Sequence, residues 1–202
     1  MRYHYYVSVI LALIFTLTFT PLFGIKDVQA QQNQTSEKES ATKGESLSNV
    51  IFNSLNNISY QQYLDAGDKN FKLADINADV ILVQIFSMYC PHCQRDAPNM
   101  NNFFNLIQKS ESYKDKIKFI GIGVGNSEFE VEFFRKTYSV EFPLLPDQDF
   151  KIHKLLGEVR TPYFIGFKKI KDGSLKLFMS ESGGDREPKA FLEQIVKQAD
   201  IK

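Results

Sequence analysis

Apolar and polar positions along the chain follow two different periods, which predict strands and helices in turn. Residues 80–86 and 117–124 are nearly continuous apolar runs rich in β-branched side chains, a pattern typical of strands buried on both faces of a sheet. Between these runs, large apolar side chains recur at helical spacing over residues 100–107, and we expect a helix that reaches about Ser110. The pattern therefore predicts a parallel β-α-β unit.

A second helix is expected after the second strand. Ser127 and Glu130 have the spacing of a capping box, in which each side chain satisfies a backbone N–H at the helix start. We expect this helix to reach about Tyr138 and a short helix to follow at residues 150–156.

The last third of the chain predicts an antiparallel hairpin and a covering helix. Strand-like residues 163–169 and 175–179 flank the turn sequence at 171–174. Pro188 suits a first helical turn, and apolar residues beyond it share one helix face. The order predicts one α/β domain over residues 50–202, with a mixed central sheet flanked by helices.

The N-terminus predicts export. Arg2 precedes an apolar run at residues 7–23, and small residues end at Ala30, where a signal peptidase would cut. We expect residues 1–30 to be a signal peptide, with retention of residues 7–23 as a membrane anchor as the alternative. Residues 31–49 are polar, with Leu47 as the one large apolar residue, and predict a flexible linker.

The charge balance argues against a nucleic-acid partner. The chain has 24 basic and 24 acidic residues and no block of like charges.

The chain contains two cysteines, Cys90 and Cys93, at the junction between the first predicted strand and its helix. A helix N-terminus favours thiolate over thiol, so Cys90 is the expected nucleophile. Cys93, one turn further into the helix, is the expected resolving thiol. We predict that this pair is a redox-active disulfide and that the protein needs no other cofactor.

A pair of cysteines at this spacing has other possible uses. A structural disulfide across two residues would stabilise little, because the loop that it closes is short. A zinc site needs two more ligands, and only His92 and His153 lie in the predicted mature chain. Copper(I) binding by the two thiols stays open as a function of another class. A peroxidase is less consistent with the sequence, because the chain has no lone cysteine apart from this pair.

Three features resemble the thioredoxin superfamily: the run FSMYCPHCQRDAP at residues 86–98, Pro98 within it, and the later Thr161-Pro162 pair. Within the superfamily, the chain from about residue 71 onward is similar to the exported TlpA/ResA-like thiol-disulfide oxidoreductases. The predicted helix at 127–138 and the following FPLLPD sequence resemble the helical insertion of that group. The resemblance implies a thioredoxin-like fold.

The same resemblance implies how substrates bind. Pro162 is expected to be cis and to face the cysteines, while the Thr161 backbone meets an extended peptide. Tyr89 stands where thioredoxins usually have Trp. We predict that Tyr89, Pro91, Thr161 and Pro162 contact substrate.

Two positions near the cysteines differ from the residues that these related families usually have. Gln84 replaces the buried Asp that helps to move the proton of the second thiol, and Asp96 lies where TlpA/ResA-like proteins often have Glu. Asp96 shares a helix face with Cys93 and is a candidate general base for it. The alternative is that Asp96 only complements the helix dipole.

His92 bears on the direction of exchange. A protonated or hydrogen-bonding His92 would stabilise the Cys90 thiolate and make the disulfide more oxidising. The Pro-His dipeptide also occurs in DsbA-type oxidants, with potentials near about −120 mV against about −270 mV for thioredoxin. The alternative is a solvent-exposed histidine without electronic effect.

We expect an exported reductase of protein disulfides, periplasmic or otherwise extracytoplasmic, with a DsbA-like oxidase as the alternative. The expected clients are exported cysteine proteins, for example apocytochrome c, and the expected electron donor is a membrane thiol-disulfide protein.

Overall fold

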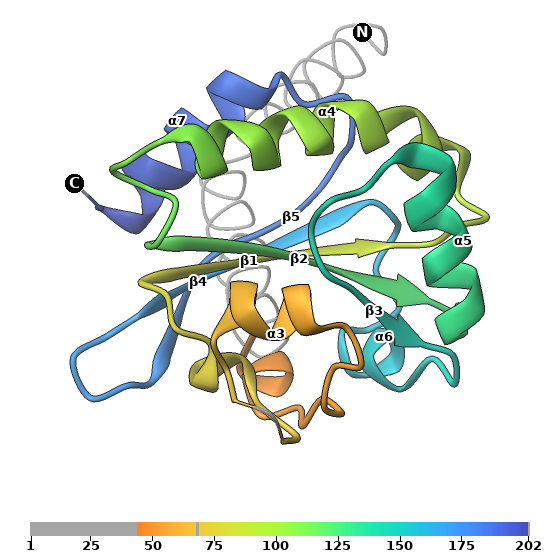
Figure 1. Ribbon diagram of the computed structural model, residues 1–202, viewed down its shortest axis with the longest axis horizontal. Helices are drawn as coiled ribbons and strands as arrows, with labels where there is room; N and C mark the ends of the chain where they lie inside the picture. Colours follow the sequence, from red (N-terminus) through yellow and green to blue (C-terminus); the bar gives the residue numbers. More distant parts are fainter. Residues whose placement is uncertain (1–43, 68, 202) are drawn as a thin grey trace, which may run out of the picture. The chain divides into compact units, whose positions relative to one another are not determined.

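A five-stranded mixed sheet forms the centre of the structure, a computed structural model that describes residues 44–67 and 69–201 (Figure 1). The strand order is β3-β2-β1-β4-β5. β1 and β2 pair in parallel, as do β2 and β3, whereas β4 runs antiparallel to both β1 and β5. The strands are β1 (Val80–Phe86), β2 (Ile117–Val124), β3 (Leu144–Asp147), β4 (Tyr163–Lys169) and β5 (Leu175–Ser182).

Helices cover both faces of this sheet. α4 and α7 lie over one face and α3 lies beneath the other, while α5 flanks the β3 edge (Figure 1). The α-helices are α3 (Ile58–Leu64), α4 (Pro91–Lys109), α5 (Glu128–Tyr138), α6 (Lys151–Leu155) and α7 (Pro188–Ala199), and a 3-10 turn, η1, spans Leu73–Asp75.

The alternation of β1 side chains divides the interior into two apolar cores. Val80, Leu82 and Phe86 pack with α4, α5 and α7, whereas Ile81, Val83 and Ile85 pack with α3, η1 and α6. Both faces of β1 are therefore buried, which explains why its sequence is almost uniformly apolar.

Two glycines of β2 let neighbouring groups come close to the sheet. A Cβ atom at Gly121 would lie 2.6 Å from a methyl group of Leu144 and 3.2 Å from the Phe86 ring. A Cβ atom at Gly123 would lie 2.6 Å from Val131 Cγ1 of α5. Both positions need glycine because side chains from elsewhere fill the space.

The predicted α/β fold, with a mixed sheet flanked by helices, is confirmed. The capping box is present: Ser127 Oγ accepts from the Glu130 N–H, and Glu130 Oε2 accepts from the Ser127 N–H. The sequence did not predict α3, η1 or the strand β3. β3 was missed because Pro146 interrupts it, and this proline is tolerated because β3 is an edge strand.

The predicted linker extends too far. Residues 44–48 form a helical turn, and Leu47 is fully buried in the core between α3 and the sheet. One apolar residue cannot fold a segment alone, but here Leu47 inserts into a core that the rest of the chain builds. The folded part therefore includes residues before Val50.

The signal peptide or anchor predicted at residues 1–30, and residues 31–43 of the linker, lie outside the described residues. Within residues 44–67 and 69–201, no helix is long and apolar enough to cross a membrane.

Candidate active site

Cys90 is the N-cap residue of α4. β1 ends at Phe86, and the Cys90 N–H donates to the Ser87 carbonyl oxygen across a tight turn, at 3.1 Å. Pro91 then occupies the first helical turn, where its missing N–H costs no helical hydrogen bond. The Cys93 N–H donates to Cys90 Sγ at 3.3 Å, so the sulfur takes the place of a capping oxygen.

The surroundings of Cys90 favour its thiolate. Burial of the half-buried sulfur raises the pKa of the Cys90 thiol, but hydrogen bonds from the side chains of Cys93 and Thr161 lower it. The backbone N–H groups of Cys93 and His92 lower it further, and the pKa of Cys90 lies below its ordinary value of 9.0. A partly accessible thiol with a lowered pKa is a nucleophile.

Cys93 has the opposite character. Its side chain is 1% exposed, and burial together with the hydrogen bond to Cys90 raises the pKa of the Cys93 thiol well above its usual range. Both cysteines are free thiols in this structure. The pair is therefore asymmetric, with an accessible acidic thiol followed by a buried, protonated one.

The segment before β4 brings Thr161 and Pro162 to the cysteines. The Thr161–Pro162 peptide bond is cis, and β4 pairs antiparallel with β1 directly beside the active-site turn. The Cys90 thiol donates to the Thr161 carbonyl oxygen at 3.4 Å. The structure thus places both residues of the predicted substrate-binding pair at the nucleophile.

Asp96 is fully buried on the inner side of α4, next to the loop that covers Pro162. Its Oδ1 accepts from the Asp185 N–H at 2.9 Å, and its Oδ2 has no hydrogen-bond partner. A Cβ atom at Gly184 would lie 3.1 Å from Pro162 Cγ and 3.5 Å from Asp96 Cγ, so this glycine fits between the two.

Burial raises the pKa of the Asp96 carboxyl. The backbone N–H groups of Asp185 and Arg186 and the positive charge of Arg186 offset only part of this rise, and the negative charge of Asp185 adds to it. Asp96 is thus not a solvated carboxylate that merely complements the helix dipole. Gln84, at the thioredoxin Asp position, is also buried but cannot ionise.

The other buried carboxylic acid in the described residues is Asp147. Its two oxygens accept from the backbone N–H groups of Ile152 and His153 at the start of α6. Asp147 has a structural role, which leaves Asp96 as the buried acid on the helix that carries the cysteines.

The His92 ring is exposed and bonded to Arg95 one turn along α4. Arg95 Nη2 lies 2.8 Å from His92 Nδ1, and because a guanidinium can only donate, Nδ1 is the acceptor in this contact. The hydrogen bond that His92 gives to Cys90 comes from its backbone N–H. The electronic role predicted for the His92 imidazole stays a prediction.

Tyr89 is exposed, and its hydroxyl donates to Glu130 of α5. The same carboxylate holds the Ser127 N–H and hydroxyl, so it joins the residue before Cys90 to the capping box of α5. Hydrogen bonding to Glu130 raises the pKa of the Tyr89 hydroxyl, and the same bond lowers the pKa of Glu130.

Two supporting residues were not identified from the sequence. The Met88 N–H donates to Asn126 Oδ1 at 2.8 Å, and Gln94 Nε2 donates to the Met88 carbonyl oxygen at 2.7 Å. These side chains hold the turn that precedes Cys90. Polar residues next to a strand end or a helix start are candidates for such a role, but they are too common in sequences to identify these two.

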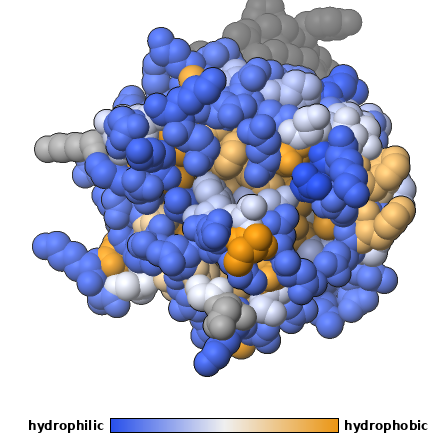
Figure 2. Space-filling model, viewed as in Figure 1, coloured by the Kyte–Doolittle hydropathy of each residue, from blue (hydrophilic) through white to orange (hydrophobic). Residues whose placement is uncertain are grey.

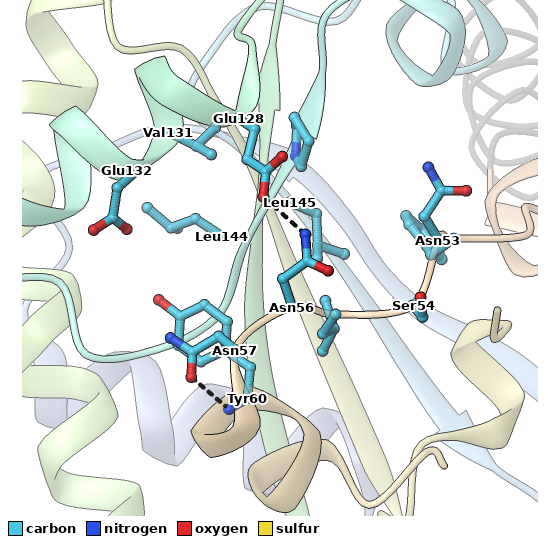
Figure 3. Close-up of a pocket in the computed structure, with 13 residues that line it drawn as sticks. Asn53, Ser54, Asn56, Asn57, Tyr60, Glu128, Val131, Glu132, Leu144 and Leu145 are labelled. Atoms are coloured by element: carbon cyan, nitrogen blue, oxygen red, sulfur yellow. Dashed lines mark hydrogen bonds between the residues drawn. The ribbon is translucent and has the colours of Figure 1, made fainter. Parts of the chain in front are cut away.

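The described residues contain a cleft of about 510 Å³ between α5, β3 and the segment at residues 52–57 (Figure 3). Glu128, Val131 and Glu132 of α5 line one wall, and residues 52–57 with Tyr60 line the opposite wall. Asn56 Nδ2 donates to Glu128 Oε1 across it at 3.2 Å. None of the predicted site residues lines this cleft.

No group of three or more His, Cys, Asp and Glu side chains suited to a metal ion occurs within residues 44–67 and 69–201. Both histidines there have other contacts: His92 meets Arg95, and His153 Nε2 lies 2.9 Å from the Val159 carbonyl oxygen. The prediction that the protein has no cofactor beyond its cysteines stays a prediction.

The sequence profile of the AhpC/TSA family matches residues 54–179, which include the cysteine pair and the Thr161–Pro162 bond. The chain belongs to this family. Family membership and the resemblance to TlpA/ResA-like proteins agree over the same part of the chain.

Curated relatives specify the chemistry further. The thiol-disulfide oxidoreductase ResA of Geobacillus thermodenitrificans is 22% identical over 133 residues, which are 65% of this chain and 71% of the relative. ResA of Bacillus subtilis is 25% identical over 112 residues, 55% of this chain and 54% of the relative, so the chain spans about half of that protein. The prediction of a thiol-disulfide oxidoreductase is confirmed.

Solved structures confirm the thioredoxin-like fold. A secreted disulfide oxidoreductase of Mycobacterium tuberculosis, homologous to DsbE of E. coli, has a TM-score of 0.53 at 15% identity, covering 76% of this chain and 98% of that one. StoA of Bacillus subtilis has a TM-score of 0.50 at 16% identity, covering 71% of this chain and 95% of that one.

Proposed function

We propose that the protein reduces disulfide bonds of other exported proteins by dithiol-disulfide exchange. The observation that supports this most directly is the asymmetry of the pair: Cys90 is accessible with a lowered pKa, and Cys93 is buried and protonated. This arrangement separates the attacking thiol from the resolving thiol.

The reaction has two steps. The Cys90 thiolate attacks one sulfur of the client disulfide, which forms a mixed disulfide and releases the other client sulfur as a thiolate. Cys93 then loses its proton and attacks Cys90 Sγ, which closes the Cys90–Cys93 bond and releases the second client sulfur. Two electrons pass from the enzyme dithiol to the client, which leaves with two thiols.

The second step needs a proton acceptor for Cys93, because burial opposes formation of its thiolate. We propose Asp96 for this role, directly or through a water molecule. Asp96 lies one helical turn from Cys93, is buried, and has one carboxyl oxygen without a partner. Its raised pKa brings the carboxyl closer to a range in which it can both take and release a proton.

Asp96→Asn tests this role through the pH dependence of the second step. In Asp96→Asn, release of a peptide from its mixed disulfide with Cys90 should slow, and the pH dependence due to the carboxyl should disappear. Formation of the mixed disulfide should respond less, because Cys90 performs it. An unchanged pH profile of release would remove Asp96 from the mechanism.

The lowered pKa of Cys90 also favours a second candidate, a disulfide-forming oxidase. A stabilised thiolate stabilises the reduced form and raises the reduction potential. Equilibration of the Cys90–Cys93 pair with glutathione buffers separates the two directions. A potential above about −150 mV would assign the protein to the oxidants, and a value nearer that of thioredoxin would support the reductase.

For a reductase outside the cytoplasm, electrons must come across a membrane, so we propose a membrane thiol-disulfide protein as donor. Exported cysteine proteins that await haem or metal, such as apocytochrome c, are the proposed clients.

Copper(I) binding by the pair is tested by titrating the protein with copper(I) while the free thiols are counted. Stoichiometric tight binding without exchange activity would replace the enzyme proposal.

A further inference from the structure

α5 exposes two phenylalanine rings close to the active-site turn. Phe129 is 76% exposed and Phe133 is 52% exposed, and their ring centroids are 6.5 Å apart. Figure 2 shows apolar surface at the α5 edge of the molecule. Apolar side chains grouped on a surface indicate a contact with another molecule more often than isolated ones do.

These rings are not covered by the rest of the described chain. Val131 and Phe134 supply the buried face of α5, and Glu128 and Glu132 face the cleft on one side (Figure 3). Phe129 and Phe133, four residues apart, lie together on the outer face that remains.

The Tyr89–Glu130 hydrogen bond joins this outer face to the nucleophile. Glu130 lies next to Phe129 in sequence and one turn before Phe133, and it accepts from the hydroxyl of Tyr89, the residue before Cys90. Tyr89 is itself 64% exposed. We call Tyr89, Phe129 and Phe133 the aromatic strip, because they lead from Cys90 onto α5.

We propose that the aromatic strip binds an apolar segment of the client polypeptide, next to the cysteine that Cys90 attacks. This deepens the proposed function and rests on it. Tyr89 is exposed and directly precedes Cys90, so a client whose disulfide lies at Cys90 can place a neighbouring segment against the strip. Aromatic side chains are also the common anchors of protein contacts.

The charge of α5 favours this occupant over a membrane surface. Glu128 and Glu130 lie in its first turn, whereas Glu132 pairs with Arg135 and Lys136. The acidic first turn, which contacts Tyr89 through Glu130, repels anionic headgroups. The preferred segment is therefore apolar, with neutral or basic flanks and few acidic residues. If a second copy of this protein bound the aromatic strip, it would block the access of client to Cys90.

The test compares two cyclic peptides, each closed by a disulfide between its two cysteines. One carries a flanking pair of leucines and the other a pair of serines in the same positions, with the pair placed at either end in separate syntheses. The full-length reduced protein reduces each peptide, and the rate with glutathione disulfide measures thiol reactivity in every variant and normalises the peptide rates.

We expect the wild-type protein to prefer the leucine peptide by about tenfold in the second-order rate constant of reduction, and Phe129→Ser/Phe133→Ser to lose most of this preference. Ile170→Ser is the matched control. Ile170 is 40% exposed and follows β4 at the opposite end of β1 from Cys90, so the preference should persist there. The single variant Phe129→Ser repeats the comparison if the double variant does not fold.

A wild-type protein without preference for leucine, or a double variant that keeps it, would overturn the inference alone. A wild-type protein that reduces neither the peptides nor glutathione disulfide would overturn the proposed function, and the inference with it. A fall in preference that depends on protein concentration would assign the strip to a second copy instead.

Discussion

The Asp96 carboxyl accepts a hydrogen bond from the backbone N–H of Asp185 at 2.9 Å, across 89 residues of sequence. This bond ties the first turns of α4 to the loop that covers the cis proline, since the Gly183 N–H donates to the Pro162 carbonyl oxygen at 3.1 Å. One buried acid, Asp96, therefore connects the helix that carries both cysteines to the loop over the cis proline.

We predict that Asp96→Asn is more stable than wild type at neutral pH, by about 1 kcal/mol, because a neutral amide costs less to bury than a carboxylate. The amide oxygen can still accept from the Asp185 N–H. Thermal or urea unfolding measures the difference.

The difference should depend on pH in a defined direction. Burial raises the folded-state pKa of Asp96 above its ordinary value of 3.8. Stability from this group is thus complete below pH 3.8 and is lost as the pH rises through the folded pKa. The gain in Asp96→Asn should shrink in acid. Asp149→Asn, at an exposed carboxylate, should change little, and a less stable Asp96→Asn at pH 7 would contradict the prediction.

The two thiols should react with iodoacetamide at very different rates. In the reduced protein we expect Cys90 to be alkylated faster than Cys93 by about tenfold or more near pH 7, because only Cys90 is accessible and has a lowered pKa. The pH at which the alkylation rate of Cys90 is half its maximum should lie below 9.0. Mass spectrometry of tryptic peptides measures both sites. Unfolding should make the two rates similar, and similar rates in the folded protein would remove the assignment of roles.

Glu130→Gln should lower the pKa of the Tyr89 hydroxyl. The hydrogen bond to the Glu130 carboxylate is the main cause of its raised pKa, and a neutral amide neither repels a phenolate nor accepts as strongly. Alkaline absorbance titration of each protein, minus that of its Tyr89→Phe counterpart, isolates this one tyrosine. Glu128→Gln is the control, since Glu128 bonds to Asn56 instead. A Tyr89 titration that is the same in both glutamine variants would show that the contact does not form in solution.

His92→Ala should leave the pKa of Cys90 close to its wild-type value. The backbone N–H of residue 92, which lowers the pKa of Cys90, is retained, and the ring that is lost contacts Arg95. The pH dependence of Cys90 alkylation measures the pKa. A rise of about one unit in His92→Ala would instead restore the imidazole to the mechanism and strengthen the oxidase alternative.

Much of the fold was predictable because its buried strands and amphipathic helices have strong periods. β1, β2 and α4 follow directly from the apolar pattern, and the capping box at Ser127 marks the start of α5 within one residue. β3 and α3 could not be predicted in this way. β3 is four residues long and contains Pro146, and α3 buries only Leu64.

The site was predictable where chemistry is local in sequence and not where it depends on tertiary contacts. The spacing of Cys90 and Cys93 was enough to place the nucleophile at a helix start. The burial of Asp96 depends on a loop 89 residues away, so the sequence left its two roles open. The contact of Tyr89 with Glu130 likewise depends on how α5 packs against the sheet.

Substitution of Gly123 is expected to affect activity more than folding. An added methyl group there would meet Val131 at 2.6 Å, and α5 would have to move outward to make room, taking Glu130 with it. The strand itself would survive, since alanine is compatible with extended backbone. A random-mutagenesis screen that scores client reduction would therefore recover Gly123 variants as folded proteins with poor turnover, although this residue contacts neither cysteine nor client.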